Sequence, residues 1–509
     1  MGQALLEQLN QLNESLGRLL PEFAGFVTIV LAFLADLSRP RARPRPAAWV
    51  TLMGMGAMFS LALLEYGAAP AAGQAQPLGM LLPSAFSALG KVIVSGVGLL
   101  AAFSFLWEET SSTTNKPMSE HWLVLACMLP GLLLLTQAQH LLLVFVAIEL
   151  VSIGSYVLVA FRKEDPRAAE AALKYFLFGA ASAGVFFFGL SLVYGLSGSL
   201  SVTEIAASDR WAAAPVAQKA VALGLVLVGL SFKITAFPFH FWSPDAYQAA
   251  PTPFLPFLTT VPKIAAFWVL FLLADLASAT GLADVWQWLV GGLALASMTF
   301  GNLGALGQHD VKRLLAWSGV AHTGYLLLGL VAVTRLQAGI KGVVFYLIFY
   351  AVFNILAFKL TLRMERIAKT ADYRRWKPVA QLRTAIFALP FLVAMIGLTG
   401  LPPTAGFIGK LMVFLPLWEG YTASGAPLLL VLLIAGVLNT VISLVYYLRV
   451  PASLILRPKP DESPPADAAQ PAPGGNNWEK LLWLVLAGAG VLFGFLGFDA
   501  LLNLVERSL

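Results

Sequence analysis

Charged side chains occur within apolar stretches of this sequence, and their types are those that carry protons. Placing one charge at the centre of a membrane helix costs roughly 2.5–3.5 kcal/mol, so several of them would oppose insertion unless they served a purpose. A buried lysine can gain and lose a proton as its neighbours or hydration change. We therefore predict a polar path through the protein interior. The residues concerned are Lys91, Glu149, Lys174, Lys233, Lys263, Lys359 and Lys410.

Two of these lysines lie beside sequences that interrupt helices. Lys233 occurs in SFKITAFPFHFW, where Pro238 lacks a backbone donor, and Lys410 ends GLPPTAGFIGK, which is rich in proline and glycine. Backbone groups freed within a membrane must face protein or water. Interrupted apolar segments at matching places in two halves of a chain indicate a transporter with a site near the membrane midplane.

Two histidines extend the predicted path. Histidine titrates near physiological pH, so His240 and His322 would act as relays between the lysines. A purely structural role is the alternative for His322, in WSGVAHTGY.

Glu149 and Lys174 are expected to form a coupled pair across two helices. Pro166 would begin the second of these helices and place Lys174 about 12 Å inside it. The alternative for Lys174 is that its ammonium group reaches the membrane surface along a flexible side chain. For Lys91, which lies near a helix end, this is the favoured interpretation.

The elements that must position these residues are membrane-spanning helices. Only 12% of the 509 residues are charged and 58% are hydrophobic, which leaves too little polar surface for soluble domains. Apolar runs of about 20 residues predict an all-α integral membrane protein with about fourteen spans. The loops on one side hold 21 Lys and Arg and those on the other side six, which predicts both termini outside the cytoplasm. The predicted spans are 21–37, 49–64, 85–106, 122–136, 141–161, 168–196, 219–239, 254–273, 286–306, 314–333, 341–362, 385–418, 427–448 and 481–502.

Similar offsets between charged residues predict an internal repeat. Lys233 and Lys410 are 177 residues apart, and Glu149 and His322 are 173 apart. The repeated unit would contain five helices, so the second copy would be inverted, with one discontinuous helix in each copy. The predicted organisation is a polar N-terminal segment (1–19), three N-terminal helices (20–110), a first repeat (121–275), a second repeat (284–450), a flexible cytoplasmic linker (458–478) and a last helix (479–503).

Several kinds of chemistry are excluded by the sequence. The single cysteine, Cys127, rules out internal disulfides and cysteine-ligated clusters within the chain. No Walker motif, HExxH motif or dinucleotide fingerprint is present. The basic residues lie between apolar runs, so nucleic acid is not an expected partner. We expect no metal or cofactor in this chain, and energy must come from an ion gradient or from partner subunits.

Five motifs surround the residues singled out above. They are ELVSIGSYVLVAFR at Glu149, EAALKYFLFGAASAG at Lys174, FKITAFPFHFWSPDAYQAAPTP at Lys233, VKRLLAWSGVAHTGY at His322 and GLPPTAGFIGK at Lys410. Together they resemble the antiporter-like subunits of respiratory complex I, from about residue 21 to 502. Within that family, the lysine that ends the last motif is similar to subunit N.

The resemblance implies fourteen transmembrane helices, two inverted five-helix repeats and membership of the proton-pumping arm of NADH:quinone oxidoreductase. It also implies other membrane-arm subunits as partners, FMN, iron–sulfur clusters and quinone in partner subunits, and a place in the bacterial inner membrane. Lys359 departs from the family pattern and is a further candidate relay. The proton-transfer positions implied by the resemblance are Glu149, Lys174, Lys233, Lys263 and Lys410, with His240 and His322 as relays.

Three other functions fit the same pattern. They are a subunit of a multisubunit Na⁺/H⁺ antiporter of the Mrp type, a subunit of a membrane-bound hydrogenase, and a passive scaffold. Flavin and iron–sulfur partners would favour complex I, a flavin-free Na⁺-exchanging assembly the antiporter, and a nickel-iron partner the hydrogenase. A scaffold would tolerate neutral substitutions at Lys233 and Lys410.

Overall fold

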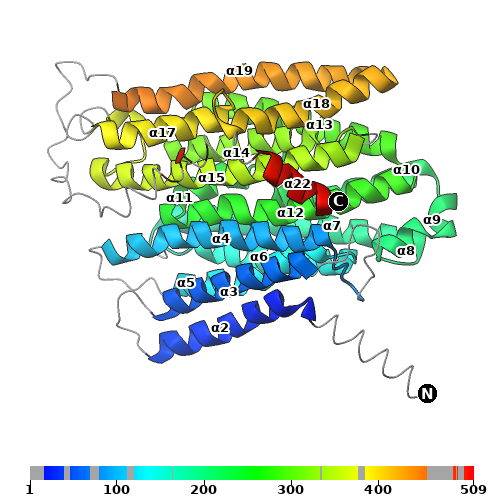
Figure 1. Ribbon diagram of the computed structural model, residues 1–509, viewed down its shortest axis with the longest axis horizontal. Coiled ribbons are helices and arrows are strands. Elements are labelled where there is room, and N and C mark those ends of the chain that lie inside the picture. Colours follow the sequence, from blue (N-terminus) through cyan, green and yellow to red (C-terminus); the bar gives the residue numbers. More distant parts are fainter. Residues whose placement is uncertain are drawn as a thin grey trace.

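The computed structural model is a bundle of long helices that lie side by side (Figure 1). It describes residues 17–38, 46–68, 79–111, 120–162, 164–332, 335–376, 384–455, 485, 487, 488, 490 and 498–508. Within these residues, eleven helices are long and apolar enough to cross a membrane, which confirms an all-helical membrane protein. They are α2 (Leu20–Ser38), α3 (Pro46–Ala68), α4 (Ala85–Ser111), α5 (Glu120–Gln137), α6 (Leu141–Val159), α7 (Pro166–Ser197), α10 (Val216–Lys233), α12 (Leu255–Ala279), α13 (Ala283–Leu306), α15 (Leu336–Ala368) and α19 (Pro427–Ile455).

Further helices complete the bundle. Three of them are α14 (Val311–Leu328), α17 (Thr384–Thr399) and α18 (Ala405–Ser424). The short elements are α8 (Val202–Ala206), α9 (Asp209–Ala213), α11 (Trp242–Ala249), η1 (Thr252–Phe254) and η3 (Tyr373–Arg375). The last described helix, α22 (Phe498–Ser508), contacts α4 and α15. Most of the predicted 1–19 segment, the 458–478 linker and most of the predicted helix at 479–503 lie outside the described residues.

The chain crosses the bundle from one side to the other, with α2 and α3 at one edge and α19 at the opposite edge (Figure 1). Burial follows this order. The apolar windows of α12 and α15 are 94% and 89% buried, whereas those of α2 and α19 are each 28% buried. Apolar side chains on the outer helices therefore face outward, as a lipid-facing surface requires. α12 and α15 form the core in which charged groups need partners.

Helix α10 ends at Lys233, beside the proline that predicts an interruption. Residues 234–241 form turns, and α11 follows in the same segment of chain. Within the turns, Thr235 adopts a φ of 62°, which residues other than glycine seldom adopt. The N–H of Phe237 donates a hydrogen bond to Ser297 Oγ on α13, at 2.9 Å. The backbone freed by the interruption thus faces protein.

A second interruption separates α17 from α18. Gly400 follows the end of α17 with a φ of 79°, a left-handed conformation that favours glycine. At Gly406, a Cβ atom would lie 1.9 Å from the carbonyl oxygen of Gly397, so the close approach of the two helix halves requires glycine. Lys410 lies on α18, soon after this interruption.

Two helices begin at acidic caps at the same end of the bundle. α7 begins at Pro166, as predicted, and Asp165 accepts a hydrogen bond from the N–H of Arg167 at 3.0 Å. Asp310 caps α14 in the same way by accepting from the N–H of Arg313 at 3.0 Å. These caps satisfy backbone donors that the first helical turn leaves unpaired.

Candidate functional site

Lys233 is buried against α6. Its Nζ donates a hydrogen bond to Ser152 Oγ, 3.2 Å away, and only 5% of the residue is exposed. Ser152 lies one helical turn beyond Glu149, which is half-buried and acts electrostatically on Lys233. The end of α10 therefore carries an ammonium group that faces both a hydroxyl and a carboxyl group of α6.

Lys174 forms ion pairs with Glu170 and Asp245, and not with Glu149 as predicted. Its Nζ lies 2.7 Å from Glu170 Oε1 and 3.1 Å from Asp245 Oδ2, and 44% of its side chain is exposed. The expected coupling of Lys174 with Glu149 is therefore wrong. The position of Lys174 along α7 agrees with the prediction, because the helix begins at Pro166. The partners of the Lys174 side chain differ from the prediction because α11 supplies Asp245.

Helix α14 connects Lys233 to Lys263. Thr323 Oγ1 donates to the carbonyl oxygen of Ile234, next to Lys233, at 2.5 Å, and also contacts the carbonyl oxygen of Gly319 at 3.1 Å. Lys263 Nζ donates to that same carbonyl of Gly319 at 2.8 Å. Lys263 is 3% exposed and lies on α12, the most buried helix. Polar contacts of α14 thus extend from the Lys263 ammonium to the backbone carbonyl next to Lys233, while the Lys233 ammonium itself faces Ser152 on α6.

His322 is held between two tyrosine hydroxyls. Its Nδ1 lies 2.8 Å from the hydroxyl oxygen of Tyr346, and its Nε2 lies 2.8 Å from that of Tyr447. The Tyr447 hydroxyl donates onward to Ser318 Oγ at 2.8 Å. Because Tyr447 gives its one hydroxyl hydrogen to Ser318, this arrangement has His322 donating from Nε2 to Tyr447 and accepting at Nδ1 from Tyr346.

Tyr350 places an aromatic ring between Lys263 and His322. The Lys263 ammonium lies 5.2 Å from the centroid of this ring, and the ring centroids of Tyr350 and His322 are 4.8 Å apart. A cation near a ring face is attracted to it.

Lys410 uses a carbonyl group freed by the second interruption. Its Nζ donates to the carbonyl oxygen of Thr399, the last residue of α17, at 2.9 Å, and to Thr440 Oγ1 at 3.4 Å. It also lies 4.0 Å from the ring centroid of Tyr325, which belongs to α14. α14 therefore contacts the surroundings of three buried lysines, Lys233, Lys263 and Lys410.

The other two predicted relays lie apart from this line. His240 is buried among aromatic rings, with ring centroids 5.3 Å from Phe237 and 5.0 Å from Trp317. Lys359, on α15, donates to the carbonyl oxygen of Ser104 on α4 at 2.8 Å. The structure thus brings together Glu149, Lys233, Lys263, His322 and Lys410, and places His240 and Lys359 in other surroundings.

Sequence reasoning missed the tyrosines that contact His322 and the lysines. Tyr346 and Tyr350 are four residues apart, the spacing that places side chains on one face of a helix. That spacing was a usable signal. Tyr447 offered none, because it lies on α19, 125 residues away from His322.

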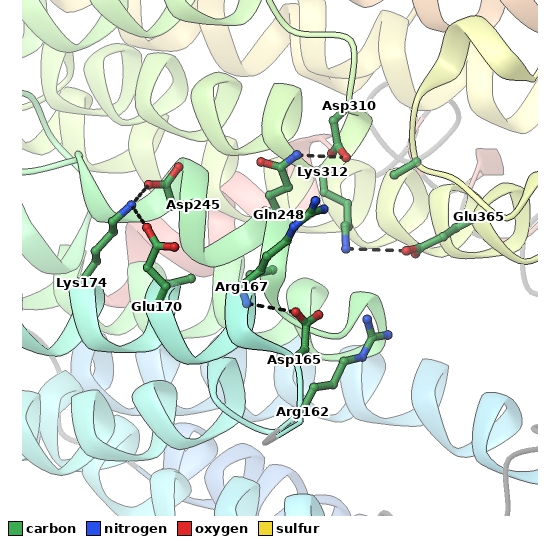
Figure 2. Close-up of a pocket in the computed structure, with 13 residues that line it drawn as sticks. Arg162, Asp165, Arg167, Glu170, Lys174, Asp245, Gln248, Asp310, Lys312 and Glu365 are labelled. Carbon is green, nitrogen blue, oxygen red and sulfur yellow. Dashed lines mark hydrogen bonds and ion pairs between the residues drawn. The ribbon is translucent and has the colours of Figure 1, made fainter.

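A polar cavity of about 460 Å³ opens at the end of the bundle where α7 and α14 begin (Figure 2). Lys174 lies between Glu170 and Asp245, and Lys312 lies 3.7 Å from Glu365. Thr252 Oγ1 also donates to Glu365, at 2.5 Å. The cavity is lined by Arg162, Asp165, Arg167, Glu170, Ala171, Lys174, Asp245, Gln248, Ala249, Asp310, Lys312, Glu365 and Ala371.

Asp372 follows the cavity residue Ala371 in a loop outside the spans. Burial alone would raise the pKa of Asp372, but hydrogen bonds from the side chain and backbone of Arg374 hold that pKa below its ordinary value. The acid is therefore ionised at neutral pH and keeps a fixed ion pair beside the cavity.

A polar seam runs from the cavity toward Lys263 between α12 and α15. Below the Thr252–Glu365 contact, Thr259 Oγ1 donates to Asn354 Oδ1 at 2.7 Å, and Lys263 and Tyr350 follow on the same two helices. Among the described residues, no group of three or more His, Cys, Asp or Glu could hold a metal ion.

The structure places interrupted helices beside buried lysines and surrounds these lysines with polar contacts. This arrangement defines an ion-translocating membrane protein of the antiporter-like class. The family model described as NADH:quinone oxidoreductase/Mrp antiporter, TM, matches residues 138–443. A chain of respiratory complex I from Thermus thermophilus is 29% identical, with a TM-score of 0.73 over 94% of this chain and 98% of that chain. A chain of the Mrp complex from Dietzia sp. DQ12-45-1b has a TM-score of 0.74 at 18% identity, over 97% of each chain, which shows a shared fold.

The NADH-quinone oxidoreductase subunit N of Anaeromyxobacter sp. (strain Fw109-5) is 36% identical over 87% of this chain and 88% of its own length. This chain belongs to the NADH-quinone oxidoreductase subunit N family, the antiporter-like membrane subunits of respiratory complex I.

Proposed function

We propose that the connected line from Glu149 to Lys410 carries protons within the membrane arm of NADH:quinone oxidoreductase. The observation that carries this proposal is that one helix, α14, reaches the surroundings of every lysine in the line. Lys233, Lys263 and Lys410 are each at most 5% exposed, and α14 contacts the carbonyl next to Lys233, supplies the carbonyl bound by Lys263, and places the Tyr325 ring beside Lys410. Ionisable side chains are costly to bury within a membrane. Where they lie together in the interior of a helix bundle, they commonly form a proton relay.

In this proposal, quinone reduction in partner subunits changes the charge felt by Glu149. A more negative neighbour favours the protonated form of Lys233, and a less negative one favours its deprotonation. The proton then passes by way of Lys263 and the tyrosine-bracketed His322 to Lys410. Lys174 acts at the mouth of the polar cavity, where protons enter, rather than as the partner of Glu149.

The helices support an inverted repeat of five helices within a fourteen-span arrangement. Antiparallel bridges join His140 to Ser201 and Asp310 to Asp372, so each bridge connects the start of one helix to the loop after the next. The first pair lies beside α6 and α7, and the second pair beside α14 and α15. Since successive spans alternate in direction, the two bridges lie at opposite ends of the bundle, as inversion requires. The interrupted segments α10–α11 and α17–α18 occupy matching positions as the discontinuous helices.

We place both termini on the side opposite the polar cavity, in the periplasm of a bacterial inner membrane. The basic residues around the cavity, such as Arg162, Arg167 and Lys312, then face the cytoplasm. Partner subunits of the membrane arm would supply the route for charge. FMN, iron–sulfur clusters and quinone would be bound by other subunits of the complex.

The test is to replace Lys233 by Met in the assembled enzyme and measure NADH-driven proton pumping in reconstituted vesicles. Lys233→Met should assemble, since it removes a buried charge, and should abolish pumping or coupled turnover. Lys341→Met is the matched control. Lys341 lies near the start of α15, is paired with Glu506, and has 25% of its side chain exposed. Pumping at the wild-type rate in Lys233→Met would exclude the proposed relay.

A further inference from the structure

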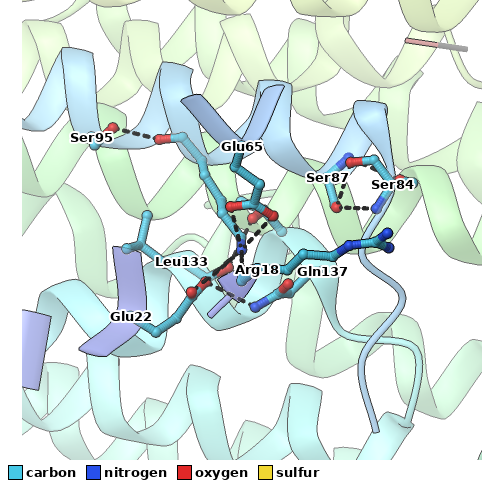
Figure 3. Close-up of polar contacts among 10 residues, drawn as sticks. Arg18, Glu22, Glu65, Ser84, Ser87, Ser95, Leu133 and Gln137 are labelled. Carbon is cyan, nitrogen blue, oxygen red and sulfur yellow. Dashed lines mark hydrogen bonds and ion pairs between the residues drawn. The ribbon is translucent and has the colours of Figure 1, made fainter. Parts of the chain in front are cut away.

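A second group of buried charges lies outside the proton line, among the first helices. Lys91 of α4 is fully buried, with two carboxylates around its ammonium group (Figure 3). Its Nζ lies 3.0 Å from Glu22 Oε1 on α2 and 2.9 Å from Glu65 Oε2 on α3. The side chains of Glu22 and Glu65 are 4% and 6% exposed. The expectation that Lys91 extends to the membrane surface is therefore wrong.

The three residues, here called the triad, carry an unbalanced charge. Two ionised carboxylates and one ammonium group sum to a net charge of −1 in a buried place, which is costly. Two like charges that share one partner disfavour each other's ionised form. One bound proton would bring the triad to neutrality.

Other charged groups nearby do not supply the missing balance. Arg18 precedes α2 and gives its backbone carbonyl to Lys91 Nζ at 3.0 Å, while its side chain extends away from the ammonium group (Figure 3). The Arg18 charge acts on Glu65. However, the Arg18 side chain is partly exposed to solvent, and solvent screens its charge. α5 contributes only the neutral side chain of Gln137.

Gln137 distinguishes the two carboxylates. Its Nε2 donates to Glu22 Oε1 at 2.8 Å, so Glu22 has two donors, Gln137 and Lys91. Among the described residues, Glu65 accepts from Lys91, whose Nζ lies 3.0 and 2.9 Å from the two carboxylate oxygens. A carboxylate with more donors is more stable when ionised, so the proton belongs on Glu65.

The side-chain amide oxygen of the same glutamine lacks a donor. Gln137 is 2% exposed, and its Oε1 has no hydrogen-bond partner among the described residues. A buried amide oxygen without a donor is costly, and a protonated carboxyl or a water molecule bound to it would supply one. A metal cation fits less well, because the Lys91 ammonium already occupies the centre between the carboxylates.

The triad lies at the end of the bundle opposite the polar cavity. Glu22 is near the start of α2, Glu65 near the end of α3, and Gln137 ends α5. Toward α12, the neighbouring Gly90 packs against Trp268, since a Cβ at Gly90 would lie 2.5 Å from Trp268 Nε1. The triad thus lies near the end of the bundle opposite the polar cavity, and an aromatic ring stands between it and the helix of Lys263.

We propose that Glu65 of the Glu22–Lys91–Glu65 triad binds one exchangeable proton, at a site separate from the line that runs from Glu149 to Lys410. The proton sets the charge of the contact that joins α2 and α3 to α4. Loss of the proton leaves a net charge of −1 at this contact.

The test is infrared difference spectroscopy of the purified complex between acidic and alkaline buffer, which detects protonated carboxyl groups. The wild type should lose one buried carboxyl band as pH rises. Glu65→Gln and Glu22→Gln should each lack that band, because a single remaining carboxylate pairs with Lys91 and needs no proton. Lys91→Met should instead add a second protonated carboxyl. The surface variant Glu419→Gln should keep the wild-type spectrum, since Glu419 is 41% exposed.

Glutamine has the shape of a protonated glutamate, so the two Gln variants should assemble even if Lys91→Met does not. A Glu65→Gln spectrum equal to that of the wild type at every pH would show a permanently ionised triad and overturn the proposal. A band that shifts in Glu22→Asp and stays in Glu65→Asp would refute the assignment to Glu65. These spectra need no turnover, so their outcome is independent of the pumping test on Lys233.

Discussion

Lys233 and Ser152 are joined by a hydrogen bond of 3.2 Å between the lysine Nζ and the serine Oγ, across α10 and α6. Because Ser152 lies one turn from Glu149, the lysine is close to a hydroxyl and a carboxyl group of the same helix. The two groups should differ in their effect on proton transfer. The carboxyl changes the charge balance of Lys233, whereas the hydroxyl changes only one hydrogen bond.

Glu149→Gln should therefore reduce pumping more than Ser152→Ala. A single hydrogen bond contributes about 1 kcal/mol, so Ser152→Ala should slow pumping by about fivefold. Removing the carboxylate should slow it by roughly tenfold or more, because the charge that favours protonated Lys233 is lost. Proton pumping per NADH oxidised, measured in vesicles with both variants, checks the order. Equal effects would show that Glu149 acts only through packing.

Tyr447→Phe should impair the relay at His322 while keeping the ring in place. The substitution removes the hydroxyl group that contacts both His322 Nε2 and Ser318 Oγ. An unpaired buried polar group costs about 1–3 kcal/mol, so we expect roughly a tenfold loss of pumping. Tyr421→Phe, in a half-buried tyrosine near the end of α18, is the control and should pump normally. Normal pumping in Tyr447→Phe would indicate a structural role for His322.

The features of the fold that depend on local sequence could be predicted, because a membrane imposes them. Backbone groups in lipid must be paired within a helix, so apolar runs of sufficient length can hardly form anything else. The interruptions at Lys233 and before Lys410 were visible for the same local reason, since proline and glycine lie beside them. Pro166 likewise began its helix as expected.

The partners of the charged groups could not be predicted, because they depend on how helices are rotated against one another. Lys174 was assigned to Glu149, but α11 supplies Asp245 instead. Glu22 and Glu65 converge on Lys91 from positions 69 and 26 residues away. No periodicity within one helix encodes such a contact.

Lys174→Met should slow pumping in a manner that depends on salt. The lysine is 44% exposed at the mouth of the polar cavity, where charges act over distance and are screened by ions. We expect a loss of about threefold at low ionic strength that shrinks at high ionic strength, and little change in stability, since exposed ion pairs contribute about 0–1 kcal/mol. Pumping measured at two salt concentrations tests this. A complete loss at both would place Lys174 within the buried line instead.

Gly324→Ala should disrupt the contact between α13 and α14, and with it the position of His322. A Cβ at Gly324 would lie 2.4 Å from the backbone nitrogen of Met298 and 2.7 Å from the carbonyl oxygen of Ala294. Backbone atoms cannot move aside as side chains do, so α14 must shift. Overpacking of this kind typically costs about 1–3 kcal/mol, and small residues are what let membrane helices approach closely.

The matched control for this substitution is Gly292→Ala on α13, where nothing lies within 4 Å of the added Cβ. The control should assemble and pump like the wild type, because alanine favours a helix more than glycine does. Gly324→Ala should lower both the thermal stability of the purified complex and its pumping rate, since α14 carries Thr323 and His322 and contacts Lys410 through Tyr325. If both variants behaved alike, the close packing of α13 and α14 would not be what positions the proton line.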